Sequence, residues 1–496
     1  MLISESQILD VLRRQNHWWQ TSKVMEDLAP PFRRLAFHEI QTFLRHPELK
    51  RAVVLSGARR VGKTVLLHQL AQDAIAEGHP PRKVLYVTFE DLTLTQATLS
   101  EILGLYERNV EAIDEGTLIL LDEIHYTTGW SRSLMAIARE RPRTRIVATG
   151  SAAILLRDTK YEESGLGRWT SVHVPTLSFY EYVQLRGLTP PALPLDLVLD
   201  SLVRMEPKKR ELILSACLPL QREFNRYLLQ GGFPAFVSED VSLGMTQRLL
   251  REDVVDKALK RDMAHLYGAR NLGQLDQIFV YLCFNSGGIV EKSTLAKEMK
   301  NVSAVTVENH LQRLEAAHLI YRLDPFKLEG KKSLKPRQKI YVADPSLRNA
   351  VILRGEGLFS SDAELGQQIE ACVFKHLYAF YYPERPRFGY WRSPRGEKEV
   401  DFLAMFPDGR CLACEVKYRQ NPELGEKEGL VELARRERAP EWAFLITKNT
   451  TDYGPTGKGK IFQIPAFVFT YLLGHIELQK WLRDLSPGTR EHSHGR

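Results

Sequence analysis

The chain contains 496 residues, of which 44% are hydrophobic and 26% charged, and its formal net charge is +7. This length exceeds one compact core and predicts roughly two to four domains of ordinary globular composition. The mild basic excess permits anionic partners without proving them. Five cysteines are too few for a disulfide framework, and we find no secretory signal and no apolar run of about 18 residues. Disulfide-rich and membrane-spanning classes are therefore excluded, and we expect a cytoplasmic protein with no membrane partner.

Residues 1–50 have the apolar spacing of helices. One apolar face carries Ile8, Leu9, Val11 and Leu12, and another carries Phe37, Ile40 and Phe43. Trp18 and Trp19, which lie between these faces, could form a functional platform, but aromatic packing is the interpretation we favour.

A phosphate-binding motif follows the apolar run 52–55. The pattern G-x-x-x-x-G-K-[ST] is matched by Gly57, Ala58, Arg59, Arg60, Val61, Gly62, Lys63 and Thr64, with a predicted helix beginning at Val65. Backbone N–H groups of such a loop cradle nucleotide phosphates, Lys63 reaches the β- and γ-phosphates, and the Thr64 hydroxyl holds Mg²⁺. The helix N-terminus adds a favourable field for the anion. The sequence therefore predicts an ATP and Mg²⁺ site formed by residues 57–65.

Apolar strands and helices alternate from residue 52 to about 185, which indicates a parallel α/β sheet. The predicted strands are 52–56, 84–89, 117–121 and 145–149. The third strand runs into Asp122 and Glu123, the Walker B arrangement, in which Asp122 holds Mg²⁺ and Glu123 orients or deprotonates the attacking water. A solvated strand end is the alternative, and the preceding phosphate loop favours function.

Two further residues are candidates for contact with the γ-phosphate. Ser151 follows the fourth strand, where it is either a sensor of the phosphate or part of a Gly-Ser turn. Arg168 precedes the segment 172–182 and is either an arginine finger, acting in cis or across a subunit contact, or a structural salt bridge.

These motifs together resemble those of a known family. The phosphate loop, Leu-Leu-Asp-Glu-Ile at 120–124, Thr-Gly-Ser-Ala at 149–152, and Gly167-Arg168 followed by Pro-Thr-Leu-Ser-Phe-Tyr-Glu-Tyr at 175–182 are similar to prokaryotic AAA-type (AAA_14-like) ATPases that carry a C-terminal DUF4143 region. The resemblance runs in order from about residue 30 to residue 470. It implies an AAA-like ATPase core, a helical lid and winged-helix middle, and a nuclease-like C-terminal α/β domain.

The middle of the chain predicts a DNA-binding element. Residues 190–220 are Pro-rich and charged, and Gly231-Gly232 forms a turn. A helix-turn-helix with a wing is expected within 291–323. Its polar face comprises Ser303, Thr306, Asn309, His310 and Arg313. A basic hairpin candidate follows, either a solvated face or a phosphate contact, with Lys327, Lys331, Lys332, Lys335, Arg337 and Lys339. Many winged helices mediate only protein contacts, so both DNA and protein partners stay open.

A second chemical centre is expected within 364–450. Asp401, followed one hairpin later by Glu415 and Lys417, has the spacing of the PD-(D/E)xK nuclease fold, and Glu370 on a preceding amphipathic helix completes the acidic cluster. The strand period of two puts Glu415 and Lys417 on one face. Asp401 and Glu415 would share one or two Mg²⁺ or Mn²⁺ ions that activate water, while Lys417 offsets developing charge. Taken singly, each residue is more simply a surface charge. Cys411 and Cys414 lack zinc partners and fit a strand as small apolar residues.

The expected fold is α/β, with six parts: N-terminal helices (1–50), P-loop ATPase core (51–188), linker and helical lid (189–285), winged helix with basic hairpin (286–350), PD-(D/E)xK nuclease-like domain (360–480) and disordered tail (485–496).

The expected function is ATP-driven DNA processing with a metal-dependent nuclease, by a homo-oligomer such as a hexamer. Branched or recombining DNA, such as a Holliday junction in DNA repair, is a reasonable substrate that no residue specifies. A nucleotide-operated switch, in which the nuclease-like domain only binds DNA or protein, and defence against foreign DNA are the alternatives.

Overall fold

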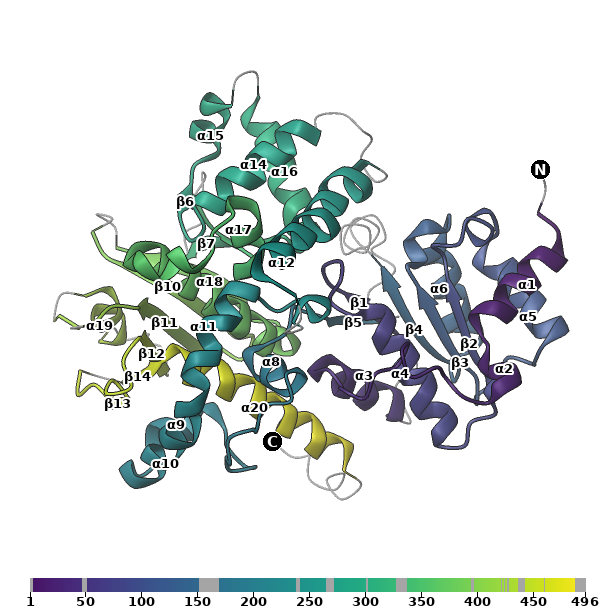
Figure 1. The fold of residues 1–496 in the computed structure, drawn as a ribbon, viewed down its shortest axis with the longest axis horizontal. Helices are drawn as coiled ribbons and strands as arrows, with labels where there is room; N and C mark the ends of the chain where they lie inside the picture. The colour runs from purple at the N-terminus through teal and green to yellow at the C-terminus, as the bar shows by residue number, and fades with distance from the viewer. Residues whose placement is uncertain are drawn as a thin grey trace. The chain divides into compact units, whose positions relative to one another are not determined.

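The computed structural model forms two compact units, Met1–Val174 with Lys480–Arg496, and Pro175–Gln479 (Figure 1). The residues that it describes are 3–46, 51–150, 169–237, 241–264, 272–299, 302–326, 337–393, 397–420, 422, 424–425, 428–435, 442–458 and 460–486.

The first unit contains a parallel sheet whose described strands follow the order β2-β3-β4-β1-β5. Its strands are β1 (Ala52–Ser56), β2 (Val84–Thr88), β3 (Leu118–Asp122), β4 (Arg145–Gly150) and β5 (Trp169–His173). The predicted parallel α/β sheet is confirmed, and its four predicted strands are β1 to β4. Their near-continuous apolar sequences are explained by burial, since β1 to β4 are buried along most of their length.

The helices of the first unit are α1 (Glu5–Gln15), α2 (Trp18–Thr21), α3 (Leu35–Arg45), α4 (Lys63–Ala76), α5 (Leu99–Asn109) and α6 (Trp130–Glu140). Helix α1 lies beside α5 (Figure 1) and buries the four apolar residues predicted to form its inner face. Trp18 and Trp19 each donate an indole hydrogen bond to the Val84 carbonyl at 3.0 Å. The two tryptophans therefore anchor α2 on β2, as the packing interpretation predicts.

The second unit begins with a series of helices, which is followed by helices and strands in the order found in a winged helix. The first helices are α8 (Phe179–Leu185), α9 (Leu199–Arg204), α10 (Pro207–Cys217), α11 (Gln221–Gln230), α12 (Leu243–Leu250) and the π-helix η7 (Arg251–Asp262). There follow α14 (Leu272–Phe284), β6 (Ile289–Val290), α15 (Lys292–Glu298), α16 (Ala304–Ala316), β7 (Ile320–Phe326) and β8 (Gln338–Val342). Strand β8 pairs antiparallel with both β6 and β7, as in the expected winged helix.

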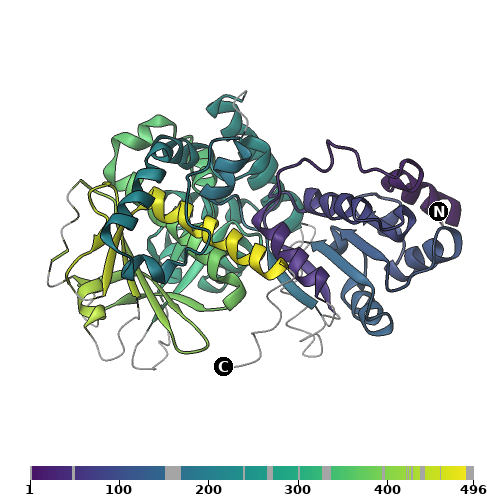
Figure 2. The same ribbon diagram turned by 90° about the horizontal axis from the view of Figure 1, so that it is seen from below.

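The C-terminal part of the chain adds α17 (Pro345–Ile352), α18 (Asp362–Tyr381), β9 (Arg387–Arg392), β10 (Glu399–Met405), β11 (Cys411–Lys417), α19 (Gly429–Ala434), β12 (Trp442–Thr447), β13 (Gly454–Pro455), β14 (Ile461–Pro465) and α20 (Ala466–Leu485). The residues of α20 from Lys480 onward are assigned to the first unit. Helix α20, yellow in Figure 2, packs on the sheet through Phe469, whose ring lies 5.5 Å from that of Phe444 on β12. Cys411 and Cys414 lie on β11, as expected.

The winged-helix strands and the C-terminal strands belong to one sheet. Its described order is β13-β14-β12-β11-β10-β9-β7-β8-β6, because β7 pairs with β8 up to Leu323 and then with β9 from Asp324 to Phe326. The predicted boundary between residues 350 and 360 therefore separates segments that share hydrogen-bonded strands.

Candidate functional site

The phosphate loop lies between β1 and α4, and its backbone requires glycine. Gly62 has φ +94°, in the left-handed region that disfavours side chains. A Cβ on Gly57 would lie 2.2 Å from the Val174 carbonyl oxygen, so only glycine fits there. Arg60 also has a positive φ, of +65°. These conformations turn the loop back on itself ahead of α4, as phosphate binding requires.

Lys63 and Thr64 form the first turn of α4. The Lys63 ammonium is buried and donates to the carbonyls of Gly57 at 3.0 Å and Ala58 at 2.9 Å, so it points into the loop. The Thr64 hydroxyl donates to Asp122 Oδ2 at 2.8 Å. The structure therefore brings together the lysine, the threonine and the first Walker B carboxylate as the sequence predicts.

Asp122 accepts hydrogen bonds from hydroxyl groups on three other elements. Besides Thr64, Tyr86 on β2 donates to Oδ2 at 3.0 Å, and Thr149 on β4 donates to Oδ1 at 2.6 Å. The Thr149 oxygen also accepts the backbone N–H of Glu123 at 2.9 Å. Asp122 and Thr64 offer hard oxygen ligands 2.8 Å apart, a donor set that fits Mg²⁺.

Glu123 combines backbone strain with an unusual protonation equilibrium. Its φ of +49° lies in the left-handed region, which is uncommon for a residue other than glycine. Burial, with a contribution from the charge of Asp122, raises the pKa of Glu123 to about 7, although Lys63 and Arg59 act in the opposite direction. His125 Nδ1 lies 3.2 Å from Glu123 Oε2. A carboxyl of this pKa is suited to accept a proton near neutral pH.

Several residues of this site were missed by sequence reasoning. Arg34, which precedes α3, is buried and donates to the Val61 carbonyl in the loop at 2.6 Å. Tyr86 and Thr149 contact Asp122 as described above. The only sequence signal was the polar end of each strand, which at β4 led to Ser151 rather than Thr149. Ser151 and Arg168 lie outside the described residues.

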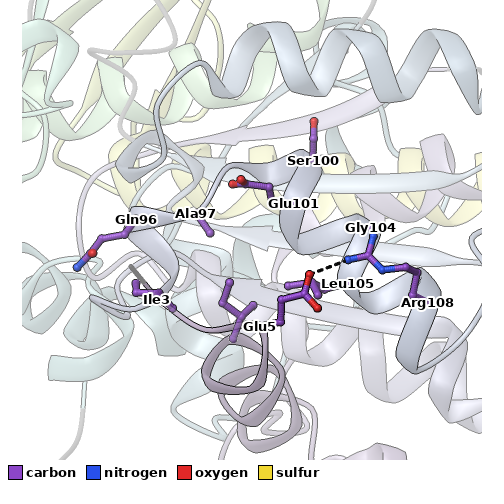
Figure 3. Close-up of a pocket in the computed structure, with 10 residues that line it drawn as sticks. Ile3, Glu5, Gln96, Ala97, Ser100, Glu101, Gly104, Leu105 and Arg108 are labelled. Carbon is purple, nitrogen blue, oxygen red and sulfur yellow. Dashed lines mark hydrogen bonds and ion pairs between the residues drawn. The ribbon is translucent and has the colours of Figure 1, made fainter. Parts of the chain in front are cut away.

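A separate pocket of about 540 Å³ lies between α1 and α5 (Figure 3). Its wall includes the ion pair of Glu5 with Arg108 at 3.2 Å, and Glu101, which caps α5 by hydrogen bonds to Thr98. None of the phosphate-loop residues lines this pocket. It is therefore not the nucleotide site.

In the second unit, two of the predicted nuclease carboxylates lie close together, and a lysine side chain lies between them. Lys339 on β8 places its ammonium 2.6 Å from Glu370 Oε1, 2.9 Å from Glu399 Oε1 and 2.7 Å from Asp401 Oδ1. The prediction that Lys339 contacts phosphate on a basic hairpin is wrong, because its side chain is buried against these carboxylates. Glu399 was not predicted to belong to this cluster. Among the described residues, no group of three or more His, Cys, Asp or Glu side chains is arranged to hold a metal ion. The donor set thus does not fit the predicted Mg²⁺ or Mn²⁺, because an ammonium already binds Asp401.

Glu415 and Lys417 share one face of β11, as predicted, and Lys417 Nζ lies 3.6 Å from Glu415 Oε1. Lys417 is closer to Glu428, at 2.9 Å. Burial, with the neighbouring charge of Asp401, raises the pKa of Glu415 to about 8. The Asp401 carboxylate that would share a metal ion with Glu415 already contacts the Lys339 ammonium at 2.7 Å, so this geometry does not support the predicted shared ion.

The residues predicted to form the polar face of the winged helix differ in their exposure. Ser303 and Asn309 are exposed, and Thr306 and Arg313 are half-buried. The assignment of His310 to this face is wrong, because α16 turns its side chain into the core, where it is 2% exposed. Burial lowers the pKa of His310 to about 4, which keeps it neutral. Lys331, Lys332 and Lys335 lie outside the described residues.

Comparison with protein families gives three matched segments. Residues 49–183, which contain β1 to β5 and the phosphate loop, match a family model described as an AAA domain. The first unit carries an AAA-type ATPase domain. Residues 221–358 match a domain of unknown function, DUF8612, and residues 365–467 match another, DUF4143. The AAA match and the DUF4143 match agree with the predicted resemblance, whereas the DUF8612 match was not predicted.

Two curated relatives span most of the AAA-containing chain. An uncharacterized protein of Haemophilus influenzae is 28% identical over 362 residues, which cover 72% of this chain and 80% of that protein. An uncharacterized protein of Methanocaldococcus jannaschii is 26% identical over 397 residues, which cover 78% and 79%. The similarity thus extends well beyond the AAA domain.

Solved structures give weaker similarities. Hsp104 of S. cerevisiae in complex with casein has a TM-score of 0.28 and 15% identity, covering 61% of this chain and 52% of that chain, so this protein spans about half of it. AMPPCP-bound DnaA of Aquifex aeolicus has a TM-score of 0.24 and 17% identity, covering 58% and 89%. The AAA assignment rests on the family match and on the loop geometry.

In the part of the chain that the structure describes, no helix has both the length and the apolar character needed to cross a membrane.

Proposed function

We propose that this AAA-type ATPase hydrolyses ATP at the phosphate loop and uses the nucleotide cycle to act on DNA. The observation that carries the ATPase assignment is the hydrogen-bonded series from Thr64 through Asp122 and Thr149 to the Glu123 backbone. It connects the Mg²⁺ ligands to the residue that would accept a proton from water.

Each group has a defined task in this proposal. Bound Mg²⁺ would neutralise charge on the phosphates. Thr64 and Asp122 hold the ion, Lys63 contacts the phosphates, and Glu123 accepts the proton of the attacking water. Arg34 stabilises the loop from behind through the Val61 carbonyl.

The ATPase assignment is tested by phosphate release from Lys63→Ala and Glu123→Gln variants. Lys63→Ala should weaken nucleotide binding, whereas Glu123→Gln should bind ATP normally and lower kcat by about 100-fold or more, because general-base catalysis contributes about 10² to 10⁴. Glu140→Gln, at the exposed end of α6, is the matched control. Full turnover in either site variant would disprove the assigned active site.

DNA is the proposed partner of the winged-helix region. The supporting observations are the order α14-β6-α15-α16-β7-β8, the exposed Ser303 and Asn309 on or beside α16, and the net charge of +7. The second helix of a helix-turn-helix commonly enters the major groove, and neighbouring cations contact phosphates.

The DNA proposal is tested by measuring phosphate release with single-stranded, duplex, forked and four-way DNA. We expect one shape to stimulate turnover, and Asn309→Asp to reduce that stimulation by charge repulsion while basal turnover stays unchanged. Asn225→Asp, at an exposed position of α11, is the control. Equal turnover with every DNA would instead favour the nucleotide-operated switch acting on a protein partner.

The proposal includes a homo-oligomer in which Arg168 acts in cis or reaches a neighbour's nucleotide, as arginine fingers do in related chemistry. Light scattering with ATP, for the wild type and Arg168→Ala, tests this. We expect an ATP-bound ring to form in the wild type, and a trans-acting finger requires that Arg168→Ala mixed with Glu123→Gln restores turnover.

DNA cleavage, the second activity predicted from the sequence, is not part of this proposal. The cluster formed by Glu370, Glu399 and Asp401 holds the Lys339 ammonium, which favours the alternative in which the nuclease-like domain is a binding module.

A further inference from the structure

Lys339 is a buried cation whose hydrogen-bonding groups are acidic. Its residue is 3% exposed, and its ammonium lies within 2.9 Å of oxygens on Glu370, Glu399 and Asp401. An ammonium has three N–H donors, so three carboxylates satisfy it fully. Burial removes the hydration of a lysine ammonium, and without acidic partners nothing would offset that loss of free energy. The three carboxylates are therefore required for Lys339 to be buried as a cation.

The strand pairing explains why these side chains meet. Strand β7 leaves β8 at the pair Leu323 with Lys339 and joins β9 at the pair Asp324 with Gly389. Strand β9 in turn pairs with β10, which supplies Glu399 and Asp401. Lys339 therefore lies where β7 changes partner, and its ion pairs join the winged-helix strands to β10 and α18.

Two further hydrogen bonds hold Asp401 and Glu370 in the cluster. Asp401 Oδ2 accepts the Val416 backbone N–H at 2.9 Å, and Glu370 Oε1 accepts the Tyr341 hydroxyl as well as the ammonium. The three carboxylate oxygens within 2.9 Å of the Lys339 nitrogen favour its charged ammonium form.

We propose that Lys339 is the resident cation of the Glu370, Glu399 and Asp401 cluster and closes it to divalent metal ions. The residues that match a nuclease pattern then act as an ionic joint between the winged-helix strands and the C-terminal sheet. A metal ion bound to the same oxygens would face the ammonium at close range in a medium of low dielectric, where like charges repel strongly.

The proposal is tested by Mn²⁺ titration of the full chain, with free Mn²⁺ followed by electron paramagnetic resonance. All proteins carry Asp122→Asn to remove the Mg²⁺ site of the first unit. We expect Lys339→Met to bind one additional Mn²⁺ at least about tenfold more tightly than its parent, because the carboxylates lose their neutralising charge. Adding Asp401→Asn should abolish the gained site.

Two further variants keep this test decisive. Lys398→Met removes a lysine paired with the single carboxylate of Glu432 at 2.7 Å and should gain no Mn²⁺ site. If Lys339→Met fails to fold, the parent is compared with Asp401→Asn alone, and we expect identical Mn²⁺ binding. A parent that binds Mn²⁺, or cleaves DNA with Mn²⁺, in a manner lost with Asp401→Asn would overturn the proposal. Because the parent already lacks Asp122, neither result depends on ATP hydrolysis.

Discussion

Thr149 shows how one hydroxyl group can organise both Walker B carboxylate residues. It donates to Asp122 Oδ1 at 2.6 Å and accepts the Glu123 backbone N–H at 2.9 Å. The second bond supports Glu123 in its strained conformation, with φ +49°. Thr149 is therefore a positioning residue that acts through its neighbours.

We expect Thr149→Ala to reduce kcat for ATP hydrolysis by about 10- to 100-fold, the usual loss when a supporting hydrogen bond to a metal ligand is removed. The KM for ATP should change little, because the phosphate loop is intact. Steady-state phosphate release measures both constants.

Thr149→Ser, which keeps the hydroxyl, should recover most of the activity. Thr144→Ala removes a hydroxyl from a residue just before β4 and is the matched control, expected to behave as the wild type. A Thr149→Ala enzyme with normal kcat would rule out the positioning role.

At the scale of elements, a buried ion pair joins four segments of the second unit. Lys375 on α18 donates to Asp344 Oδ2 at 2.8 Å and to the Leu177 carbonyl at 3.0 Å. Thr176 donates to Asp344 at 2.6 Å. A Cβ on Gly232 would lie 2.5 Å from the Leu177 carbonyl oxygen, so glycine is required there. The Pro-Thr-Leu-Ser segment and the Gly-Gly turn thus serve packing around this pair.

Lys375→Met should lower the free energy of unfolding of the second unit by about 3–5 kcal/mol, because it leaves the Asp344 carboxylate buried without its cation. Burial would itself raise the pKa of Asp344, and Lys375 holds that pKa below its ordinary value. Urea unfolding measures the effect.

The double variant Asp344→Asn with Lys375→Met should regain part of the lost stability, since neither buried charge remains. Lys257→Met, which breaks a partly exposed pair with Asp253, should change stability by no more than about 1 kcal/mol. If the double variant were as unstable as the sum of the single variants, the ion pair would not be the cause.

At the scale of the whole molecule, both units contain histidines that are buried in the neutral form. Burial lowers the pKa from 6.5 to about 4 for His68, His173 and His310, and to about 3 for His376. His376 shows the reason, since its Nε2 accepts the Phe179 backbone N–H at 2.8 Å and its Nδ1 lies 2.7 Å from the Cys372 carbonyl. If Nε2 were protonated, its N–H would point at the Phe179 N–H, and neither group could accept the other's hydrogen bond.

These pKa values fix the sign of the histidines' contribution to the pH dependence. Below about pH 6.5 the unfolded chain binds protons that the folded histidines do not, so their contribution to stability is complete above that pH and falls as the pH decreases, by up to about 1.4 kcal/mol per pH unit for each histidine. Glu123 and Glu415, whose pKa values are raised to about 7 and 8, contribute with the opposite sign, so the melting temperature of each histidine variant is compared with that of the wild type between about pH 7 and 5. His376→Gln should lose less stability than the wild type as the pH falls, and His46→Gln, at an exposed position, should have the slope of the wild type. An unchanged slope in His376→Gln would contradict the neutral assignment.

Much of the first unit could be predicted because its signals are local. The four apolar strands are each buried over consecutive residues, so their sequences are apolar throughout. The phosphate loop requires particular residue types at fixed spacing, and Gly57 and Gly62 occupy the two glycine positions of this short motif. Asp122 and Glu123 ended a strand and were found for the same reason.

The errors arose where a residue's neighbours are distant in the sequence. The predicted polar face of α16 included one residue too many, His310. Only the packing of α16 shows that its side chain is buried. Tyr86 and Thr149 reach Asp122 because the strand order puts β2 and β4 on either side of β3, which no single strand reveals.

The sequence by itself was enough to predict the nucleotide site and its chemistry, because the phosphate loop and the strand-end carboxylate pair are each a short motif of consecutive residues. Only the tertiary structure decided the character of the acidic cluster. Lys339 and Asp401 are 62 positions apart and are joined by a 2.7 Å contact only because β7 changes partner between β8 and β9. Sequence spacing predicts which acids can gather, whereas the sheet register determines which cation lies among them.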